Sequence, residues 1–469
     1  MVSLQADYAA YRQKRHKILP FMIYDLILKN GTLVTPRESF KADIAVKDGK
    51  IALLGDFDSS VAAREIFDAE GKHILPGVID AHVHFREPGL TEKEDFETGS
   101  AAAAFGGVTM IADMPNTLPP TSTTARFTEK ARIAREKSYI DFGLFALLSN
   151  DNTEEIDELI QAGALGFKVF LGTSTGDIAA PSTSVLLDQM RKIALTNMRI
   201  GFHAENSDIN AYFTAICKKA PHDAEGLLLS QARPVISEAL AILTAISFAS
   251  MTGAAIHIHH ITSRDGARLV AKAKRLNINV TGETCPHYLL LDADSGAAAK
   301  VYPPIRDKSH RDKLWEALNN RTIDIITSDH APHTDSEKKL PLWEAPAGLS
   351  GVETSVNLML NEVNKGTLTI NDYARIASEA PAKIWGIYPQ KGNLLPGADA
   401  DFTIADMEKK SVIQNSGLHS KNKNSVFDGI EVRGIAAATI VRGRFIMKDG
   451  KLTGAKGAGV LVSPAHAMN

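Results

Sequence analysis

The 469-residue sequence has few of the features that mark secreted or membrane proteins. It contains 2 cysteines, Cys217 and Cys285, so a disulfide framework is excluded. This scarcity fits a reducing compartment, and we expect a cytoplasmic protein. No run of residues approaches the roughly 18–20 apolar positions of a membrane span. Residues 1–22 lack the apolar segment of a secretory signal and are expected to form an N-terminal extension.

An excess of charge of either sign is also missing. The 52 basic and 55 acidic residues give a net charge of -3, which leaves no basic field to hold a nucleic acid or an anionic membrane. Apolar residues make up 44% of the chain and charged residues 23%, as in ordinary globular proteins. The length exceeds the size at which a single hydrophobic core stops growing. We therefore expect one large domain and one smaller domain.

Both ends of the chain have the pattern of short β-strands. Residues 23–75 contain apolar runs separated by Asn30-Gly31 and Asp48-Gly49, and such dipeptides are typical of hairpin turns. The same texture returns over residues 391–455. Because each half alone is too small to bury a core, the pattern predicts one β-sandwich domain built from both segments. Residues 456–469 are expected to form a C-terminal tail.

Residues 76–390 alternate short apolar runs with stretches of helical periodicity. Eight runs are candidate strands: 77–85, 107–114, 141–148, 165–171, 199–205, 254–262, 278–286 and 323–330. Strand–helix alternation indicates parallel βαβ units, and eight of them are typical of a closed barrel. An open doubly wound sheet is the alternative, but no Gly-rich phosphate loop follows the first strand. The predicted fold class is α/β, a (β/α)8 TIM-like barrel with a small β-sandwich domain.

Polar residues gather at the carboxyl ends of these strands, which form the active-site face of a barrel. Six of them fall at the ends of five different strands: His82, His84, Lys168, His203, His260 and Asp329. Each has an ordinary explanation by itself, such as a surface histidine pair, a snorkelling lysine or a helix-capping aspartate. His82 and His84 lie two apart on one strand, so both imidazoles face the same side. The combination favours a metal site.

The residue types explain what such a site would hold. Neutral imidazoles and a carboxylate are good ligands for zinc and similar divalent ions. Two neighbouring ions need a bridging anion, and a lysine ammonium cannot supply one. A buried lysine loses its proton more easily, and the free amine can react with carbon dioxide to give a carbamate. We therefore expect two divalent ions, zinc first among the candidates, with N6-carboxylated Lys168 as the bridge.

Several motifs resemble those of the cyclic amidohydrolases, and most closely those of class I dihydroorotases. They are VIDAHVHFREPG, GGVTMIADMPNT, GFKVFLG, HAEN, HIHHITS and SDHAPHT. The resemblance extends from about residue 23 to residue 455 and implies a barrel flanked by a β-sandwich. It also implies which residue binds which metal: His82, His84 and Asp329 the first, His203 and His260 the second, and Lys168 both.

The resemblance further implies a mechanism and substrate contacts. Hydroxide between the metals would attack a ring carbonyl while Asp329 moves the proton to the leaving nitrogen. Arg86 matches the arginine that grips the carboxylate of dihydroorotate, and Asn116 and His333 match further substrate contacts. Tyr302 departs from the pattern, because many dihydroorotases have asparagine before this Pro-Pro pair.

We therefore expect reversible hydrolysis of dihydroorotate to N-carbamoyl-aspartate, the reaction of pyrimidine synthesis. The alternative is an allantoinase, a hydantoinase or an imidase-like hydrolase of another cyclic ureide. A non-catalytic scaffold ranks last, because all six metal-ligating positions are filled. The resemblance also suggests a homo-oligomer, either a dimer or a tetramer. The one other partner that we expect is the small cyclic amide substrate. The polar segment 333–351 is expected to be either a lid or a surface loop.

Overall fold

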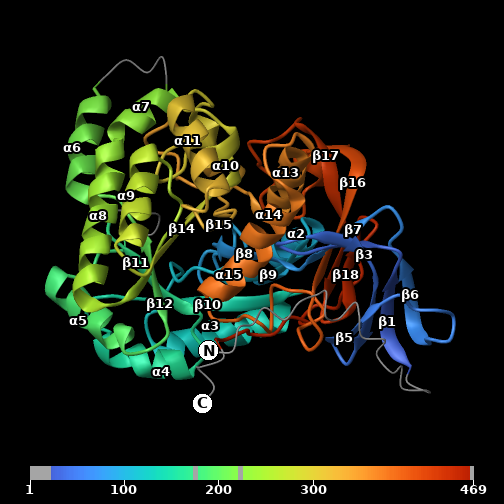
Figure 1. Ribbon diagram of the computed structural model, residues 1–469. Helices are drawn as coiled ribbons and strands as arrows, with labels where there is room; N and C mark the ends of the chain where they lie inside the picture. The colour runs from blue at the N-terminus through green and yellow to red at the C-terminus, as the bar shows by residue number, and fades with distance from the viewer. Residues whose placement is uncertain (1–22, 173–177, 220–224, 465–469) are drawn as a thin grey trace.

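The computed structural model describes residues 23–172, 178–219 and 225–464, so the predicted extension 1–22 lies outside the described residues. Eight parallel strands follow one another around a barrel in chain order, from β8 to β15. Val83 forms a parallel bridge with His330, so the segment after the last strand meets the first strand and the barrel is nearly closed. Figure 1 shows the barrel beside a separate β domain that carries both the blue and the red strands.

All eight predicted barrel strands are present. They are β8 (Val78–Val83), β9 (Val108–Asp113), β10 (Asp141–Leu147), β11 (Gly166–Phe170), β12 (Arg199–His203), β13 (Ala255–Ile258), β14 (Val280–Thr284) and β15 (Ile325–Ile326). In β8 to β11 every residue is buried. This is the pattern of parallel strands covered on both faces, and it explains why they read as continuous apolar runs.

Helices surround the barrel and connect its strands. They are α2 (Phe96–Phe105), α3 (Thr124–Lys137), α4 (Ile156–Gln161), α5 (Thr183–Ala194), α6 (Ser207–Cys217), α7 (Glu225–Ala232), α8 (Val235–Thr252), α9 (Arg264–Arg275), α10 (Pro286–Leu290), α11 (Lys308–Asn319), α12 (Asp335–Lys338), α13 (Val352–Asn364), α14 (Ile370–Ala374) and α15 (Ala380–Ile384). A π-helical turn, η3 (Arg375–Glu379), joins the last two helices. Short 3-10 turns are η1 (Thr153–Glu155), η2 (Ala297–Ala299) and η4 (Asn415–Gly417).

Helix α8 is more apolar than we expected, since the sequence analysis found no apolar run of the length of a membrane span. Its 18 residues have a mean hydropathy of 1.7, so by length and composition it matches a membrane span. It packs against α5, α9 and β13, however, and it buries Ala241, Ile242 and Ala245 in the core of the barrel. Its inner face explains part of this hydropathy. Its outer face also carries no charged residue, since the one charged residue of the helix, Glu238, is buried.

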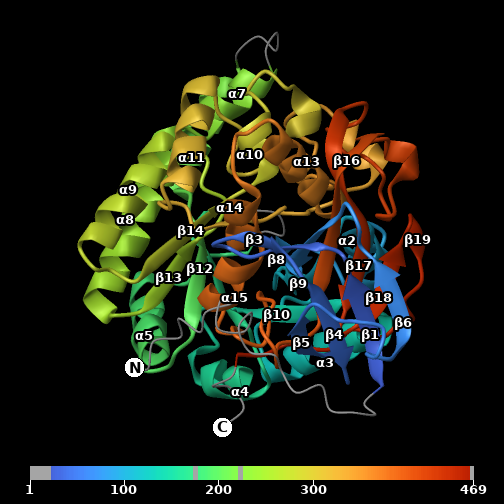
Figure 2. The same cartoon turned by 45° about the vertical axis from the view of Figure 1, so that its right-hand side comes forward.

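The second domain contains strands from both ends of the chain. One sheet holds β1 (Tyr24–Lys29), β4 (Asp43–Lys47), β5 (Lys50–Gly55) and β6 (Ala63–Asp68). The other holds β2 (Thr32–Val34), β3 (Ser39–Lys41), β7 (His73–Pro76), β16 (Phe402–Val412), β17 (Glu431–Val441), β18 (Arg444–Lys448) and β19 (Lys451–Leu452). The two segments meet where β7 pairs with β16. Figure 2 shows the blue and red strands side by side.

One predicted hairpin is wrong. Asn30-Gly31 does not join two paired strands, because β1 pairs with β4 and β6, whereas β2 pairs with β3 and β7. The turn instead carries the chain from one sheet to the other. Asn30 has a φ of 61°, and its amide donates to Asp43 at 3.0 Å, so the local turn chemistry is as expected. Asp48-Gly49 does close a hairpin, between β4 and β5.

A buried ion cluster ties the barrel to the β domain. Lys391 donates to Asp141 of β10 at 2.5 Å, to Asp401 at 2.6 Å and to Asp399 at 2.9 Å. The tail joins the same place, since the Val460 amide donates to Asp141 at 3.0 Å. We propose domain boundaries at residues 75/76 and 390/391. The residues on either side of it share one charge network.

Replacing Lys391 by methionine is expected to destabilise the protein by roughly 3–5 kcal/mol, because it removes a buried cation shared by three aspartates and leaves Asp401, whose one ion pair in the described chain is with Lys391, without a cation. The urea midpoint should fall accordingly. The matched control is Lys410→Met, which breaks an ion pair with Glu431 whose side chains are 69% and 65% exposed. That change should stay within about 0.5 kcal/mol. Equal midpoints for the two variants would contradict the structural role of Lys391.

Candidate active site

A pocket opens at the carboxyl ends of the barrel strands. Its walls include all but one of the predicted site residues: His82, His84, Arg86, Asn116, Lys168, His203, His260, Tyr302 and Asp329. The exception, His333, lies directly behind the pocket wall. Strand geometry explains the convergence, because parallel strands of a barrel bring their carboxyl ends to one face. Residues far apart in the sequence thus surround one small volume.

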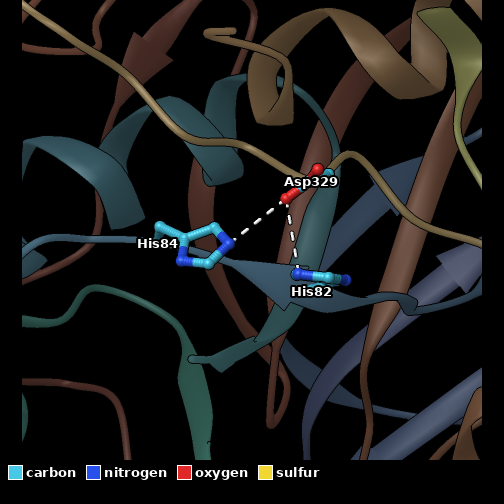
Figure 3. Close-up of side chains that lie close together, drawn as sticks. All are labelled: His82, His84 and Asp329. Carbon is cyan, nitrogen blue, oxygen red and sulfur yellow. Dashed lines mark ion pairs between the residues drawn. The ribbon is translucent and has the colours of Figure 1, made fainter. Parts of the chain in front are cut away.

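His82, His84 and Asp329 form one group of possible ligands (Figure 3). Asp329 Oδ1 lies 3.3 Å from His82 Nε2 and 3.2 Å from His84 Nε2. A tetrahedral ion about 2 Å from each ligand atom would separate those atoms by roughly 3.3 Å. Both distances therefore suit ligands of one divalent ion. Burial opposes ionisation of Asp329, but its contact with His84 holds its pKa below the ordinary value.

His203 and His260 form a second group across the pocket. His203 Nδ1 and His260 Nε2 lie 2.9 Å apart, and each atom faces the other. The second nitrogen of His203, Nε2, is held by Glu205 at 3.0 Å. Burial lowers the pKa of both imidazoles, and it does the same for His82 and His84. All four rings are therefore neutral near pH 7, which is the form that binds metals.

Lys168 differs from the other buried lysines that the structure describes. Lys130 pairs with Asp113 at 2.5 Å, Lys391 binds three aspartates, and Lys300 donates to two carbonyl groups. Among the same described residues, no carboxylate or carbonyl lies within hydrogen-bonding distance of Lys168, although its side chain is only 1% exposed. Burial lowers the pKa of Lys168 to about 7. An amine with this pKa and no anion beside it is suited to reaction with carbon dioxide.

Three of the pocket residues have left-handed backbone conformations. Their φ angles are 63° for Arg86, 38° for His260 and 47° for Asp329. Non-glycine residues adopt this region rarely and at a cost of about 1–3 kcal/mol, and such residues cluster at functional sites. The surrounding structure therefore holds these side chains in place against local preference.

Arg86 and Asn116 also line the pocket. Arg86 donates from Nε to the Pro332 carbonyl at 3.3 Å, and its Nη2 lies 3.2 Å from His333 Nε2. His333 packs behind the guanidinium, where its Nε2 donates to the Ala347 carbonyl at 3.0 Å, and it does not line the pocket. Asn116 Oδ1 accepts from His84 Nδ1 at 2.7 Å, so it also fixes a candidate ligand.

Tyr302 is held in place by residues that sequence reasoning missed. The Arg233 guanidinium lies 3.6 Å from the centre of the Tyr302 ring. Arg233 also forms a buried ion pair with Glu205 at 2.5 Å. Burial alone raises the pKa of Glu205, but the Arg233 charge and the contact with His203 lower it to about 2. Tyr302 is therefore linked through Arg233 and Glu205 to His203.

The segment 333–351 is ordered and covers one side of the pocket. It contains the helix α12, which begins with a capping box at Thr334. Lys300 donates to the carbonyls of Leu342 and Ala345, and Lys338 donates to that of Gly348. Gly348 itself lines the pocket. These contacts hold the segment in place as a wall of the pocket. They do not test whether it can open as a lid.

Comparison with known proteins gives the family. The family model described as "Amidohydrolase family" matches residues 73–446. The chain belongs to the amidohydrolase family. The resemblance seen in the motifs is thereby confirmed, and so is the expectation of a hydrolase.

Full-length relatives carry three different names. An allantoinase of Deinococcus radiodurans is 36% identical over 445 residues, covering 92% of this chain and 97% of the relative. An L-hydantoinase of Paenarthrobacter aurescens is 36% identical, covering 94% and 98%. A dihydroorotase of Methanothermobacter thermautotrophicus is 34% identical, covering 92% and 96%. The name dihydroorotase is thus one of several among the relatives.

A solved structure supports the fold. The L-hydantoinase (dihydropyrimidinase) from Arthrobacter aurescens matches with a TM-score of 0.91 at 35% identity, covering 94% of this chain and all of that one. The predicted TIM-like barrel with a β domain from both termini is confirmed by this match and by the strand order.

Replacing Lys168 tests its part in the site. Lys168→Ala and Lys168→Arg should each lower the bound metal and reduce kcat/KM by about 10³-fold or more, because neither side chain can become a carbamate and a bridging anion supports several kcal/mol of metal chemistry. Metal analysis and steady-state kinetics give the two readouts. Lys308→Ala, at an exposed position, is the control. Full metal content and turnover in both Lys168 variants would overturn the proposed bridge.

Proposed function

We propose that this amidohydrolase is a metal-dependent enzyme that opens the C–N amide bond of a small cyclic ureide. The observation that carries the proposal is the pocket at the carboxyl end of the barrel, which brings four imidazoles, Lys168 and Asp329 together. His82, His84 and Asp329 would hold one divalent ion, and His203 and His260 a second, with N6-carboxylated Lys168 between them. Zinc suits these nitrogen and oxygen donors.

Each of the chain's own residues has a task in this reaction. The bound ions would activate water and polarise the ring carbonyl. Asp329 faces the pocket from the end of the eighth strand, where it accepts a proton and delivers it to the departing ring nitrogen. Arg86, Asn116 and Tyr302 surround the remaining space and orient the ring.

Among possible substrates we favour five-membered ureide rings of the hydantoin and allantoin type. Two of the relatives described above are named allantoinase and L-hydantoinase, and the matching solved structure is an L-hydantoinase. Tyr302 supports this choice, because it departs from the asparagine expected of dihydroorotases. Its ring is fixed by Arg233, so it narrows the pocket at a defined place.

Dihydroorotate remains a second candidate on one specific observation. The guanidinium of Arg86 lines the pocket, and the residue is 1% exposed. A buried arginine binds a carboxylate with charge-assisted, often bidentate hydrogen bonds. Dihydroorotate has such a carboxylate, whereas hydantoin and allantoin do not.

We also propose that two copies of this chain associate through the outer face of α8. Ile236, Leu240, Leu243 and Met251 are 40–56% exposed on one stripe of this helix. An antiparallel copy related by a twofold axis would set Ile236 against Met251 and Leu243 against Thr244, as an isologous interface requires. Exposed residues of the neighbouring helix α6, among them Tyr212 at 66%, extend the apolar area toward the roughly 800 Å² per partner of a stable interface.

A substrate panel separates the two candidate functions. Purified, zinc-loaded enzyme should turn over hydantoin or allantoin with a kcat/KM at least tenfold above that for dihydroorotate. The reverse order would establish dihydroorotate as the substrate. No hydrolysis of any cyclic ureide or imide would overturn the proposal itself.

Arg86→Met sharpens this distinction. Loss of a hydrogen-bonded charge costs about 1.5–3 kcal/mol, so kcat/KM for dihydroorotate should fall roughly 10–150-fold. The fall for hydantoin should be smaller, since hydantoin offers no carboxylate. His333→Asn is the matched control, because it alters the contact behind Arg86 and retains the guanidinium.

Leu243→Glu tests the association of two copies. A charge at the centre of the α8 stripe should convert the dimer, or a larger assembly, to smaller species in light scattering after size exclusion. The control Thr183→Glu changes an exposed residue at the start of α5 and should leave the mass unchanged. A wild-type monomer at tens of micromolar would contradict the proposal.

A further inference from the structure

Beneath the pocket, three imidazoles converge on one carboxylate. Glu283 of β14 is fully buried. Its Oε1 lies 2.5 Å from His82 Nδ1 and 2.9 Å from His259 Nδ1, and its Oε2 lies 3.0 Å from His257 Nε2. The mechanism proposed above uses only His82 of this group. The sequence motif HIHHITS therefore contains two histidines, His257 and His259, that the active-site chemistry leaves unexplained.

The space for this cluster is built into the barrel. A Cβ atom at Gly201 of β12 would lie 2.0 Å from His259 Nε2, so any side chain there would displace the imidazole. His259 Nε2 has no hydrogen-bond partner, and the ring is 1% exposed. His257 is anchored on its other side, where Nδ1 lies 2.8 Å from Thr281 Oγ1. The two rings are thus placed to donate to Glu283 and cannot reach the pocket.

Glu283 differs from Glu205 and Asp113, two other buried acids, in its charge partners. Glu205 pairs with Arg233 at 2.5 Å, and Asp113 pairs with Lys130 at 2.5 Å. Over the described residues, the ion-pair contacts of Glu283 are to His82, His257 and His259 and include no lysine or arginine. A buried charge without a compensating charge is costly. Lys168 acts on Glu283 only through space, without an ion-pair contact, and the candidate metal site lies on the other side of His82, whose Nε2 faces Asp329.

We infer that Glu283 is a positioning residue for the metal centre. It holds His82 Nδ1–H so that Nε2 points toward Asp329, and its negative charge is compensated by the divalent ion bound at His82, His84 and Asp329. The inference rests on the proposed function only in that a divalent ion occupies this site. Carboxylates behind metal-binding histidines typically change metal affinity 10–100-fold when they are removed.

Glu283→Gln removes the charge and leaves the hydrogen bonds able to form. The new amide oxygen can accept from His82 and His259. The amide nitrogen can donate to His257 Nε2, since His257 can change tautomer and donate from Nδ1 to Thr281. A merely structural glutamate would lower stability in every state when it is replaced. Under our inference the effects on the metal-free and metal-bound protein differ in sign.

The experiment uses the full-length metal-free protein and Zn²⁺ or Co²⁺ alone as the probe. For Glu283→Gln, chelator competition should give an affinity 10–100-fold weaker than wild type, with a changed Co²⁺ absorption spectrum. The thermal midpoint of the metal-free protein should stay equal or rise, because the cost of burying a carboxyl group without a cation has been removed. Glu283→Asp keeps the charge and should retain more affinity than Glu283→Gln.

Glu238→Gln is the matched control. Glu238 is also buried in the barrel. It accepts hydrogen bonds from the amide and the hydroxyl of Thr262, at 2.8 and 2.7 Å, and from none of the candidate metal ligands among the described residues. This variant should keep wild-type metal affinity and lose stability. An affinity of Glu283→Gln within threefold of wild type, or a metal-free midpoint that falls as far as that of Glu238→Gln, would overturn the inference. Wild-type protein that binds no divalent ion would overturn the proposed function as well, so the two failures are distinguishable.

Discussion

The arrangement of this barrel depends on how buried polar groups find partners. The strands are apolar and closed on both faces, so every imidazole, carboxylate or amine inside them needs a hydrogen bond or a compensating charge. Most have one: Lys130 binds Asp113, and Arg233 binds Glu205. Several of the exceptions line one pocket. Lys168 has no anion within hydrogen-bonding distance among the described residues, and Asp329 lies 3.3 Å from His82 Nε2 and 3.2 Å from His84 Nε2, a spacing that also suits ligands of one ion. The candidate functional site is thus a place where buried polar groups lack some of their charge partners.

At the opposite end of the barrel, the buried charged groups are paired with opposite charges. Lys391 and the aspartates around it, together with the tail residue Val460, join the first residue of β10 to the β domain. There each charge has an opposite charge, and the cluster holds two structural units together. Asp141, Asp399 and Asp401 could by residue type hold a metal ion, but Lys391 already occupies the space between them. The same residue types therefore serve structure at one end of the strands and chemistry at the other.

Much of this could be predicted from the sequence, for identifiable reasons. Parallel strands buried on both faces read as apolar runs, and their carboxyl ends carry the polar residues, so the barrel and the convergence of His82, Lys168 and Asp329 followed from pattern alone. The sandwich was predicted because neither terminus could bury a core. Its pairing was not: Asn30-Gly31 is a genuine tight turn, but which strands pair is decided by the sheets on either side of it.

The supporting residues lay beyond sequence reasoning for a different reason. Glu205 follows His203 by two residues and Glu283 lies in the seventh strand, but nothing in their spacing shows that each accepts from a candidate metal ligand. The left-handed backbone of Arg86, His260 and Asp329 also has no local signal. The one available hint was the surplus of histidines in HIHHITS, since a strand with three imidazoles must place some of them away from the pocket.

Tyr302 shows how support and specificity are connected in this pocket. The tyrosine lies against Arg233, Arg233 is bound by Glu205, and Glu205 orients His203. A change of residue at position 302 therefore alters more than the shape of the wall. It removes a ring that helps to fix the arginine, and through it the carboxylate behind one metal-facing histidine. Under the proposed function, Tyr302 therefore couples the wall of the substrate pocket to the geometry of the second ligand pair through Arg233 and Glu205.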